Sequence, residues 1–280
     1  YSTLGGTPFT AYQQAFFAGA PVPVLSSSYP VVGQAAANSP FLWAWQQLLV
    51  DGMLSNVSVH MAAGDEGASA NIPNGGSNVY TSHSSPFTML VGGTSITGAY
   101  NAADDSTLAT TSDLLALALA DDPATVFQLV AAGLRTLPSN LQAEAPGPEG
   151  YATVISTLFE TVWKTLAVTD DYRVQFGSHQ TGSGGVALTT DIPDYQRDFG
   201  LAAMTQGLRG MPDVSALASG NTWYAALSNA YVNGTSDEVL HWVGGTSAAA
   251  PLWASLTAQF NVVFNDQGLY NLGYYNDLLY

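Results

Sequence analysis

The chain has 280 residues, of which 47% are hydrophobic and only 9% are charged, whereas roughly a quarter are charged in an average globular domain. Lys and Arg total 5 and Asp and Glu total 21, so the formal net charge is −16. A surface this negative repels nucleic acid and anionic membranes, because few cations are present to contact phosphate groups. The absence of cysteine excludes disulfides and thiolate metal sites, and no uninterrupted apolar run reaches the roughly 18 residues of a transmembrane helix.

The scarcity of charge also suggests tolerance of acid. Below about pH 3 most carboxyl groups are protonated, and the 5 Lys and Arg with the 4 His would then give few positive charges. Little self-repulsion would remain to unfold the chain. A salt-adapted surface or a skewed genome composition is the alternative explanation.

Several features are typical of an exported, processed protein. The sequons Asn56-Val57-Ser58 and Asn233-Gly234-Thr235 permit glycosylation of an exported chain. The sequence begins at Tyr1 without an initiator methionine or a signal peptide, as in a processed chain or a piece of a longer one. We therefore expect an extracellular glycoprotein, and the composition suggests an acidic environment.

Helix and strand patterns alternate over the first hundred residues. Residues 8–20 predict a short helix, and "PVPVLSSSYP" (21–30) predicts a strand between prolines. A helix is predicted from Ser39, because serine is a common cap and proline is favoured in the first turn. "NVSVHMAAGDEG" (56–67) and "SSPFTMLVGGTS" (84–95) predict strands, the second ending in glycines. This alternation favours an α/β fold with a mostly parallel sheet and helices on both faces.

The second part of the chain begins with a different pattern. Residues 99–165 read as helical, including "YATVISTLFETVWKTLAV" (151–168), and predict a helical insertion between strands of the sheet. "QTGSGGVALTTDIPDYQ" (180–196) predicts a glycine-rich loop leading into a proline turn. "TWYAALSNAYV" (222–232) predicts a strand, and "GGTSAAAP" (244–251) begins a helix of small residues.

The pentapeptide Val-Gly-Gly-Thr-Ser occurs twice, ending at Ser95 and at Ser247. A nucleophilic serine is best placed at the start of a helix, where amide groups and the helix dipole stabilise a developing oxyanion. Three alanines follow Ser247 and begin such a helix, whereas no helix-forming run follows Ser95. We therefore predict that Ser247 is the nucleophile and that Ser95 ends a strand.

Several segments together resemble one peptidase family. "GTSAAAP" around Ser247 resembles the nucleophile segment of the subtilisin-like clan, which includes the subtilisins and the sedolisins, or serine-carboxyl peptidases. "MAAGDEGA" (61–68) is similar to the oxyanion segment, where sedolisins carry aspartate, here Asp65. Residues 84–95, 209–220 and 269–280 also look like sedolisin segments, and no histidine has the His-Gly-Thr context of subtilisins. The chain resembles the central part of a sedolisin catalytic domain.

The resemblance implies a subtilisin-like fold and an acid-active endopeptidase that forms an acyl-enzyme. Ser247 would attack the peptide carbonyl, and Asp65 would be a protonated donor to the oxyanion. In the family the base is a glutamate oriented by an aspartate, and carboxyl groups act as acid and base only in acidic solution.

The resemblance also implies residues that bind the polypeptide substrate. Ser28 and Tyr29, in "SSSYP", match the strand that pairs with substrate, although Pro30 stands where the family usually has glycine. Gly184 and Gly185, in "TGSGG", match a glycine-rich substrate-binding segment.

The catalytic Glu/Asp pair of the family, in which the glutamate is the base, is absent from this chain. Its glutamate and aspartate lie four residues apart on one face of a helix. The residues four positions after the five glutamates are Ala70, Pro148, Thr153, Lys164 and Trp242, and none is acidic. The sequence likewise stops before the Asp- and Gly-rich loop that binds calcium in the family, so no metal site is predicted within residues 1–280.

Three alternatives remain for the function. In the first, the chain is the central piece of one catalytic core, and a companion fragment carries the Glu/Asp pair. Alternatively, it has lost catalysis and is a secreted structural or binding protein, for which the 14 tyrosines would suit self-assembly. In the third alternative Glu160 acts as the base. We favour the first, an acid-active serine-carboxyl endopeptidase completed by another polypeptide.

Overall fold

The computed structural model describes residues 7–17, 19, 22–31, 35–67, 79–98, 143–144, 154–155, 158–163, 180–219, 224–232 and 235–280. Side chains are described for these residues except 96–98, 143–144, 154–155, 158–161, 228–232 and 235–242. The chain divides into two compact units, formed by residues 1–93, 180–218 and 245–280 and by residues 94–179 and 219–244. The single core predicted over residues 1–280 stays a prediction, and the two units are described separately.

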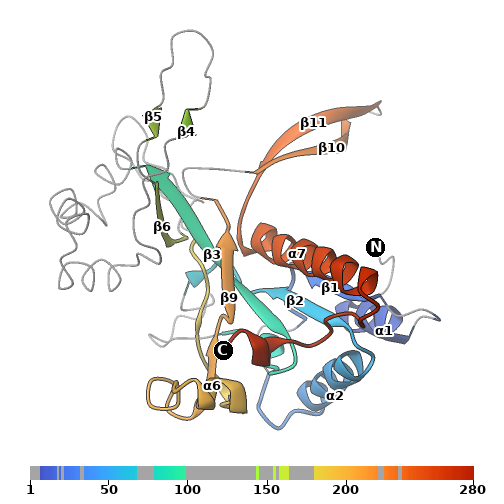
Figure 1. Cartoon of the computed structure of the whole chain (residues 1–280), viewed down its shortest axis with the longest axis vertical. Helices are drawn as coiled ribbons and strands as arrows, with labels where there is room; N and C mark the ends of the chain where they lie inside the picture. Colours follow the sequence, from blue (N-terminus) through green and yellow to red (C-terminus); the bar gives the residue numbers. More distant parts are fainter. Residues whose placement is uncertain are drawn as a thin grey trace, which may run out of the picture. The chain divides into compact units, whose positions relative to one another are not determined.

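A parallel sheet forms the centre of the first unit (Figure 1). Strand β1 (Val24–Ser27) pairs in parallel with β2 (Ser58–Ala62), and β2 pairs in parallel with the first part of β3 (Met89–Gly98). Strand β9 (Val214–Leu217) also pairs with β3. The α/β fold with a mostly parallel sheet is thus confirmed.

Helices cover both faces of this sheet. Since alternate residues of a strand point to opposite faces, neighbouring residues of β2 contact different helices. Val59 and Met61 of β2 pack in the apolar core with helices α1 (Pro8–Phe17) and α2 (Pro40–Leu54). On the other face His60 contacts α7 (Thr246–Asp266), where its Nε2 lies 3.0 Å from the Thr257 hydroxyl. All five residues of β2 are buried, as expected for a strand covered on both sides.

Helix α2 begins as the sequence predicts. The Ser39 hydroxyl accepts a hydrogen bond from the Leu42 N–H at 3.2 Å, and Pro40 is the first helical residue. These contacts satisfy one of the free N–H groups at the helix start and remove another. The fully buried Trp45 anchors the helix, because its indole N–H donates to the Ser82 carbonyl at 2.7 Å.

Shorter elements complete the first unit. Strands β7 (Gly185–Asp191) and β8 (Leu208–Met211) form an antiparallel pair, so residues predicted as loop are partly strand. The remaining elements are η2 (Thr81–His83), α6 (Asp194–Asp198) and η3 (Asn276–Leu278). The buried Arg209 pairs with Asp213 at 2.8 Å, and Asp213 also accepts from the Tyr280 hydroxyl. This ion pair ties β8 to the C-terminal segment.

The second unit corrects two sequence predictions. Residues 151–168 were predicted helical, but β5 (Val154–Ile155) and β6 (Leu158–Val162) lie there, and β6 pairs antiparallel with residues 94–98 of β3. Their β-branched residues favour strands. Strand β3 continues through its two glycines, so Ser95 lies within the strand and not at its end. Most of the predicted insertion, residues 99–165, lies outside the described residues.

Three further strands lie in the second unit. The predicted strand at 222–232 is confirmed as β10 (Tyr224–Val232), which forms a hairpin with β11 (Thr235–Val243). A short strand, β4 (Ala143–Glu144), pairs with β5. Within the described part of the chain, no helix is both long and apolar enough to cross a membrane.

We predict that two buried histidines make the fold less stable in moderate acid. Burial lowers the pKa of His60 and of His83 to about 4. A lowered pKa in the folded state stabilises the protein above the ordinary value of roughly 6.5, and this contribution is lost as the pH falls towards 4. Each histidine should therefore cost on the order of 3 kcal/mol of unfolding free energy across this window.

Urea unfolding of wild type and His60→Asn at about pH 7 and about pH 4 measures this loss. The variant should lose less stability on acidification than the wild type, whatever its stability at neutral pH. An equal pH dependence of the two proteins would contradict a neutral, buried His60.

Candidate active site

Ser247 is the second residue of helix α7, so it lies at the start of a helix, as the sequence predicts. Gly245 precedes the helix with φ 86° and ψ 170°, a conformation that is open essentially only to glycine. No side chain of its own segment caps the helix start. The cap instead comes from a distant turn, residues 64–67, which follows strand β2.

Asp65 supplies that cap. Its Oδ1 accepts hydrogen bonds from the Thr246 N–H at 2.9 Å and from the Thr246 hydroxyl at 2.7 Å. The same hydroxyl accepts from the Gly64 N–H at 3.0 Å, so Thr246 is held from both sides. Two residues that the sequence singles out, Asp65 and Ser247, are therefore brought together through the residue beside Ser247.

The second carboxyl oxygen of Asp65 faces Gly245. A Cβ atom at Gly245 would lie 2.5 Å from Asp65 Oδ2, so a side chain at this position would displace the carboxyl group. Because Oδ1 already accepts two hydrogen bonds, Oδ2 is the oxygen that is available to carry a proton. Glycine at position 245 thus permits both the turn and the close approach of Asp65.

Burial raises the pKa of Asp65 above the ordinary range of an aspartate. The two hydrogen bonds from Thr246 oppose this shift, since they favour the charged form, while the neighbouring Glu66 adds to it. The positive end of the α7 dipole also favours a carboxylate. Burial outweighs these opposing effects, so the neutral carboxylic acid is favoured over a wider range of acidic pH than for an exposed aspartate.

Ser28 contacts the nucleophile segment directly. Its hydroxyl donates to the Ser247 carbonyl oxygen at 3.1 Å. In a regular helix the N–H of residue 251 would donate to this oxygen, but that residue is Pro251, which has no N–H. Ser28 therefore supplies the hydrogen bond that Pro251 cannot make, and it fixes the first turn of α7 to the end of β1.

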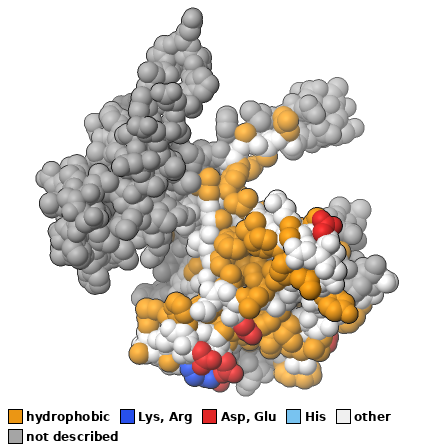
Figure 2. All heavy atoms as spheres, viewed as in Figure 1, with side chains coloured by type: hydrophobic (Ala, Val, Ile, Leu, Met, Phe, Trp, Pro, Cys, Tyr) orange, Lys and Arg blue, Asp and Glu red, His pale blue; other side chains and the backbone are white. Residues whose placement is uncertain are grey.

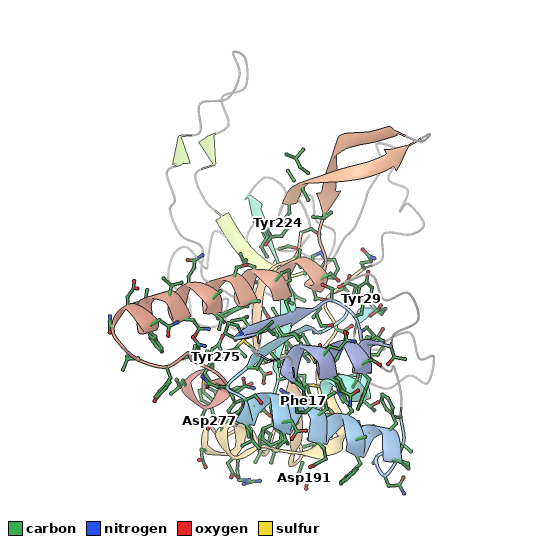
Figure 3. All side chains as sticks on the ribbon, turned by 90° about the vertical axis from the view of Figure 1, so that its right-hand side faces the viewer. Phe17, Tyr29, Asp191, Tyr224, Tyr275 and Asp277 are labelled. Atoms are coloured by element: carbon green, nitrogen blue, oxygen red, sulfur yellow. The ribbon has the colours of Figure 1, made fainter. Side chains whose placement is uncertain are left out.

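The other predicted substrate-binding residues are more loosely connected to Ser247. The side chain of Tyr29, labelled in Figure 3, is 75% exposed. Gly184 and Gly185 lie against Met211, since the Met211 carbonyl oxygen is 3.1 Å from a Cβ built at Gly184 and Gly185 pairs with Met211. Their assignment to substrate binding stays a prediction.

The residues just before Gly184 do reach the turn of Asp65. The Thr181 N–H donates to the Asp65 carbonyl at 3.1 Å, and the Ser183 N–H donates to the Gly64 carbonyl at 2.9 Å. The glycine-rich segment therefore supports the Asp65 turn from the side. Sequence reasoning missed this role, because the hydrogen bonds are backbone contacts between segments far apart in the chain.

Glu160, the candidate base within the chain, lies in β6 opposite Ile96. It is part of the second unit, and its side chain lies outside the described residues. Over the described residues no group of three or more His, Asp or Glu side chains is placed to hold a metal ion. The candidate site thus consists of Ser247, Asp65, Thr246 and Ser28.

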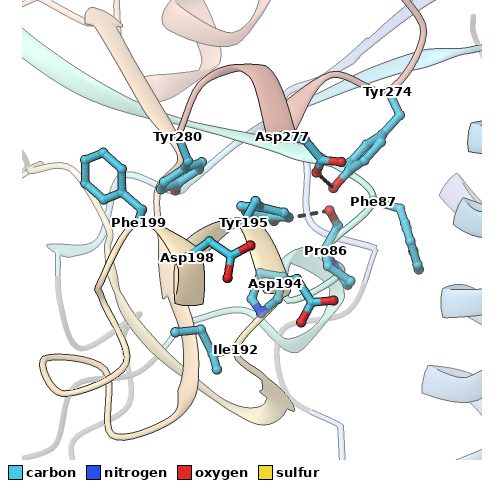
Figure 4. Close-up of a pocket in the computed structure, with 11 residues that line it drawn as sticks. Pro86, Phe87, Ile192, Asp194, Tyr195, Asp198, Phe199, Tyr274, Asp277 and Tyr280 are labelled. Atoms are coloured by element: carbon cyan, nitrogen blue, oxygen red, sulfur yellow. Dashed lines mark hydrogen bonds between the residues drawn. The ribbon is translucent and has the colours of Figure 1, made fainter.

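A pocket of about 800 Å³ in the first unit lies apart from this site (Figure 4). Aromatic rings, including Tyr195 and Tyr280, line it together with three aspartates. Two of these are already engaged, because Asp194 pairs with Arg197 and Asp277 accepts from the Tyr274 hydroxyl. None of its lining residues belongs to the Ser247 site, so its size alone gives it no role in the chemistry.

We predict that Ser28→Ala destabilises the protein by about 1 kcal/mol, because the Ser247 carbonyl then loses its hydrogen bond. In a Pro251→Ala background the restored N–H can donate to this carbonyl, so Ser28→Ala should cost measurably less. A double-mutant cycle of unfolding free energies tests this coupling. Equal costs in the two backgrounds would mean that Ser28 and Pro251 act independently.

The comparison with known proteins supports the α/β fold described above. No protein-family model matches this chain, and no curated protein matches it. Among solved structures the chain is similar to Pseudomonas sedolisin, a serine-carboxyl proteinase in complex with two molecules of pseudo-iodotyrostatin, at 21% identity and a TM-score of 0.55. The match covers 96% of this chain and 55% of that chain, so this chain spans about half of the sedolisin length. The chain has a subtilisin-like α/β fold.

Proposed function

We propose that this chain forms part of an acid-active serine-carboxyl endopeptidase, with Ser247 as nucleophile and protonated Asp65 as donor to the oxyanion. One observation carries the proposal: Asp65 Oδ1 accepts both hydrogen bonds from Thr246. These bonds fix the carboxyl group at Thr246, the residue before Ser247, and leave Oδ2 to hold a proton. The fold similarity to a serine-carboxyl proteinase supports the same function.

The chemistry follows from this arrangement. The Ser247 hydroxyl attacks the carbonyl carbon of a peptide bond while a base removes its proton, and the carbonyl oxygen becomes negative. A protonated Asp65 donates a hydrogen bond to this oxygen, and the start of α7 adds its positive dipole. The base then returns this proton to the nitrogen, so that collapse of the tetrahedral intermediate releases the amine and leaves an acyl-enzyme, which water then hydrolyses. Activity requires acid because an ionised Asp65 has no proton to donate.

The base is proposed to come from a companion polypeptide that carries the Glu/Asp pair. The surface of α7 supports this proposal, because Asp266 at its last position is its only charged residue. A surface helix normally carries charged residues on its outer face. Leu252, Leu256 and Phe260 recur at intervals of four on this helix and are 47%, 36% and 40% exposed. Figure 2 shows hydrophobic side chains gathered over this part of the surface.

This apolar stripe begins one turn after Ser247. Leu256 is nine residues, or about two and a half turns, after Ser247, so the stripe lies on the side of α7 turned away from Ser247. The stripe would therefore anchor the companion, and a further segment of the companion would carry the base to the Ser247 hydroxyl. The same stripe also favours the second candidate function, a structural protein that self-associates through α7. Glycosylation, secretion and a calcium site on a companion segment belong to the proposal as well.

Replacement of Ser247 tests the catalytic proposal. Protein produced in its own host, so that companion polypeptides are present, should cleave peptides at acidic pH and lose this activity in Ser247→Ala. Ser95→Ala is the matched control, because Ser95 occupies the same place in the other Val-Gly-Gly-Thr-Ser copy, within β3. Asp65→Ala should reduce kcat by roughly 10²- to 10³-fold.

Two outcomes would overturn the proposal. One is full acid activity in Ser247→Ala. The other is a host-produced protein that contains no second polypeptide and cleaves no peptide, which would favour the structural alternative. Mass spectrometry of the purified material identifies any companion and shows whether it carries a Glu-x-x-x-Asp helix.

We predict that Leu256→Asp releases the companion and abolishes acid activity while the chain stays folded, because a charge is costly in an apolar interface. Leu188→Asp is the control, since Leu188 lies on β7 and is 73% exposed. Co-purification and sedimentation velocity measure the two variants. A loss of self-association in Leu256→Asp, with no companion ever present, would favour the structural candidate.

A further inference from the structure

A second carboxylate, Glu66, lies directly behind the candidate oxyanion donor. The Asp65 N–H donates to Glu66 Oε2 at 2.9 Å, and the Glu66 N–H donates to the Ser183 hydroxyl oxygen at 3.3 Å. The Tyr80 hydroxyl also forms a hydrogen bond with Glu66. Glu66 therefore accepts from two donors, one of them the backbone of Asp65 itself.

The position of Glu66 is fixed by packing around Gly64. A Cβ atom built at Gly64 would lie 2.8 Å from Ser183 Oγ, 3.0 Å from Glu66 Oε2 and 3.0 Å from Tyr80 Cε2. Gly64 also has φ 116°, which disfavours other residues. Three side chains thus converge on the bare face of one glycine, so the Glu66 carboxylate is held in place beside Asp65.

No described cation neutralises Glu66. The two described arginines are engaged elsewhere, Arg197 with Asp194 and Arg209 with Asp213. The titratable groups around Asp65 in the described part of the chain are Glu66 and Tyr80. Burial and the nearby Glu66 raise the pKa of Tyr80 to about 12, so its hydroxyl remains a donor at every pH of interest.

We propose that Glu66, held by Tyr80 and Ser183, is a positioning residue whose negative charge adds to burial in keeping Asp65 protonated. Glu66 Oε2 lies 2.9 Å from the Asp65 backbone nitrogen, and a negative charge there disfavours a second charge on Asp65, since like charges repel at short range. The two donors hold the Glu66 carboxyl group in place, and Oδ2 is the Asp65 oxygen that is left to carry the proton. The inference rests on the proposed function only for its consequence, which is the upper pH limit of peptidase activity.

Titration of Asp65 by NMR with ¹³C-labelled aspartate tests the proposal without any substrate. Glu66→Gln keeps an acceptor for the Asp65 N–H but removes the charge, so the midpoint of Asp65 should fall by about one pH unit. Asp51→Asn is the control, because it removes an exposed charge from helix α2 and should leave the midpoint unchanged. Asp65→Asn assigns the resonance.

Tyr80→Phe is a second variant for the case in which Glu66→Gln does not fold. Without the Tyr80 hydroxyl, the Glu66 carboxyl group loses one of its two hydrogen bonds and is held less closely beside Asp65, so the Asp65 midpoint should fall in the same direction but less. An unchanged midpoint in the folded Glu66 variant, or an equal fall in Asp51→Asn, would overturn the proposal. A structural role of Glu66 alone would lower stability without moving this midpoint.

The failure of this proposal is distinguishable from failure of the proposed function. Ser247→Ala leaves the Glu66–Asp65 pair intact, so the effect of Glu66→Gln on the midpoint should persist in a protein that cannot catalyse. In an active assembly, Glu66→Gln should shift the alkaline limb of the pH–kcat profile down by about one unit. A moved midpoint without peptidase activity would reject the proposed function and keep the pair.

Discussion

The hydrogen bonds between Asp65 and Thr246 are the contact on which the rest of the candidate site depends. They join the turn after β2 to the start of α7, two segments 181 positions apart in the chain. The helix start has no side-chain cap of its own, so these bonds both satisfy its free N–H and place Asp65 beside Ser247. The cap of helix α7 and the placement of Asp65 next to the Ser247 segment are therefore one interaction.

The surrounding contacts make sense as consequences of this interaction. Asp65 can approach the helix only because Gly245 has no side chain, and the turn holds its shape only because Gly64 leaves room for Glu66 and Tyr80. Ser28 also fixes the first turn, because it donates to the Ser247 carbonyl oxygen that Pro251 leaves without its helical hydrogen bond. Gly64, Gly245 and Ser28 thus each answer a specific steric or hydrogen-bonding requirement near Ser247.

The sequence predicts what is local and misses what depends on distant segments. Ser39 followed by Pro40 is a complete local signal, and helix α2 begins there. The start of α7 after Gly245 was predictable for the same reason. The strands in residues 151–168 were missed because their apolar spacing also suits a helix, and partners in β3 decide between the two.

The residues of the candidate site also divide into those that the sequence predicts and those that only the fold reveals. Asp65 and Ser247 could be named from the sequence through the resemblance of their segments to sedolisins. The roles of Ser28 and Glu66 could not, because they arise from contacts with a carbonyl oxygen and with a backbone N–H whose positions only the fold defines. A hydrogen bond to the backbone leaves no residue pattern in the sequence of its partner.

The titrating groups of the first unit define a window of acid in which such a site could work. The pKa of Asp65 is raised, so its contribution to stability is fully present below the ordinary aspartate value and is lost as the pH rises through the folded value. The pKa values of His60 and His83 are lowered to about 4, so their contribution is lost as the pH falls towards 4. The protonated Asp65 and the neutral histidines therefore coexist only between about pH 4 and the raised pKa of Asp65. The charge proposed for Glu66 would raise the upper limit of this window, because that limit is set by the pKa of Asp65.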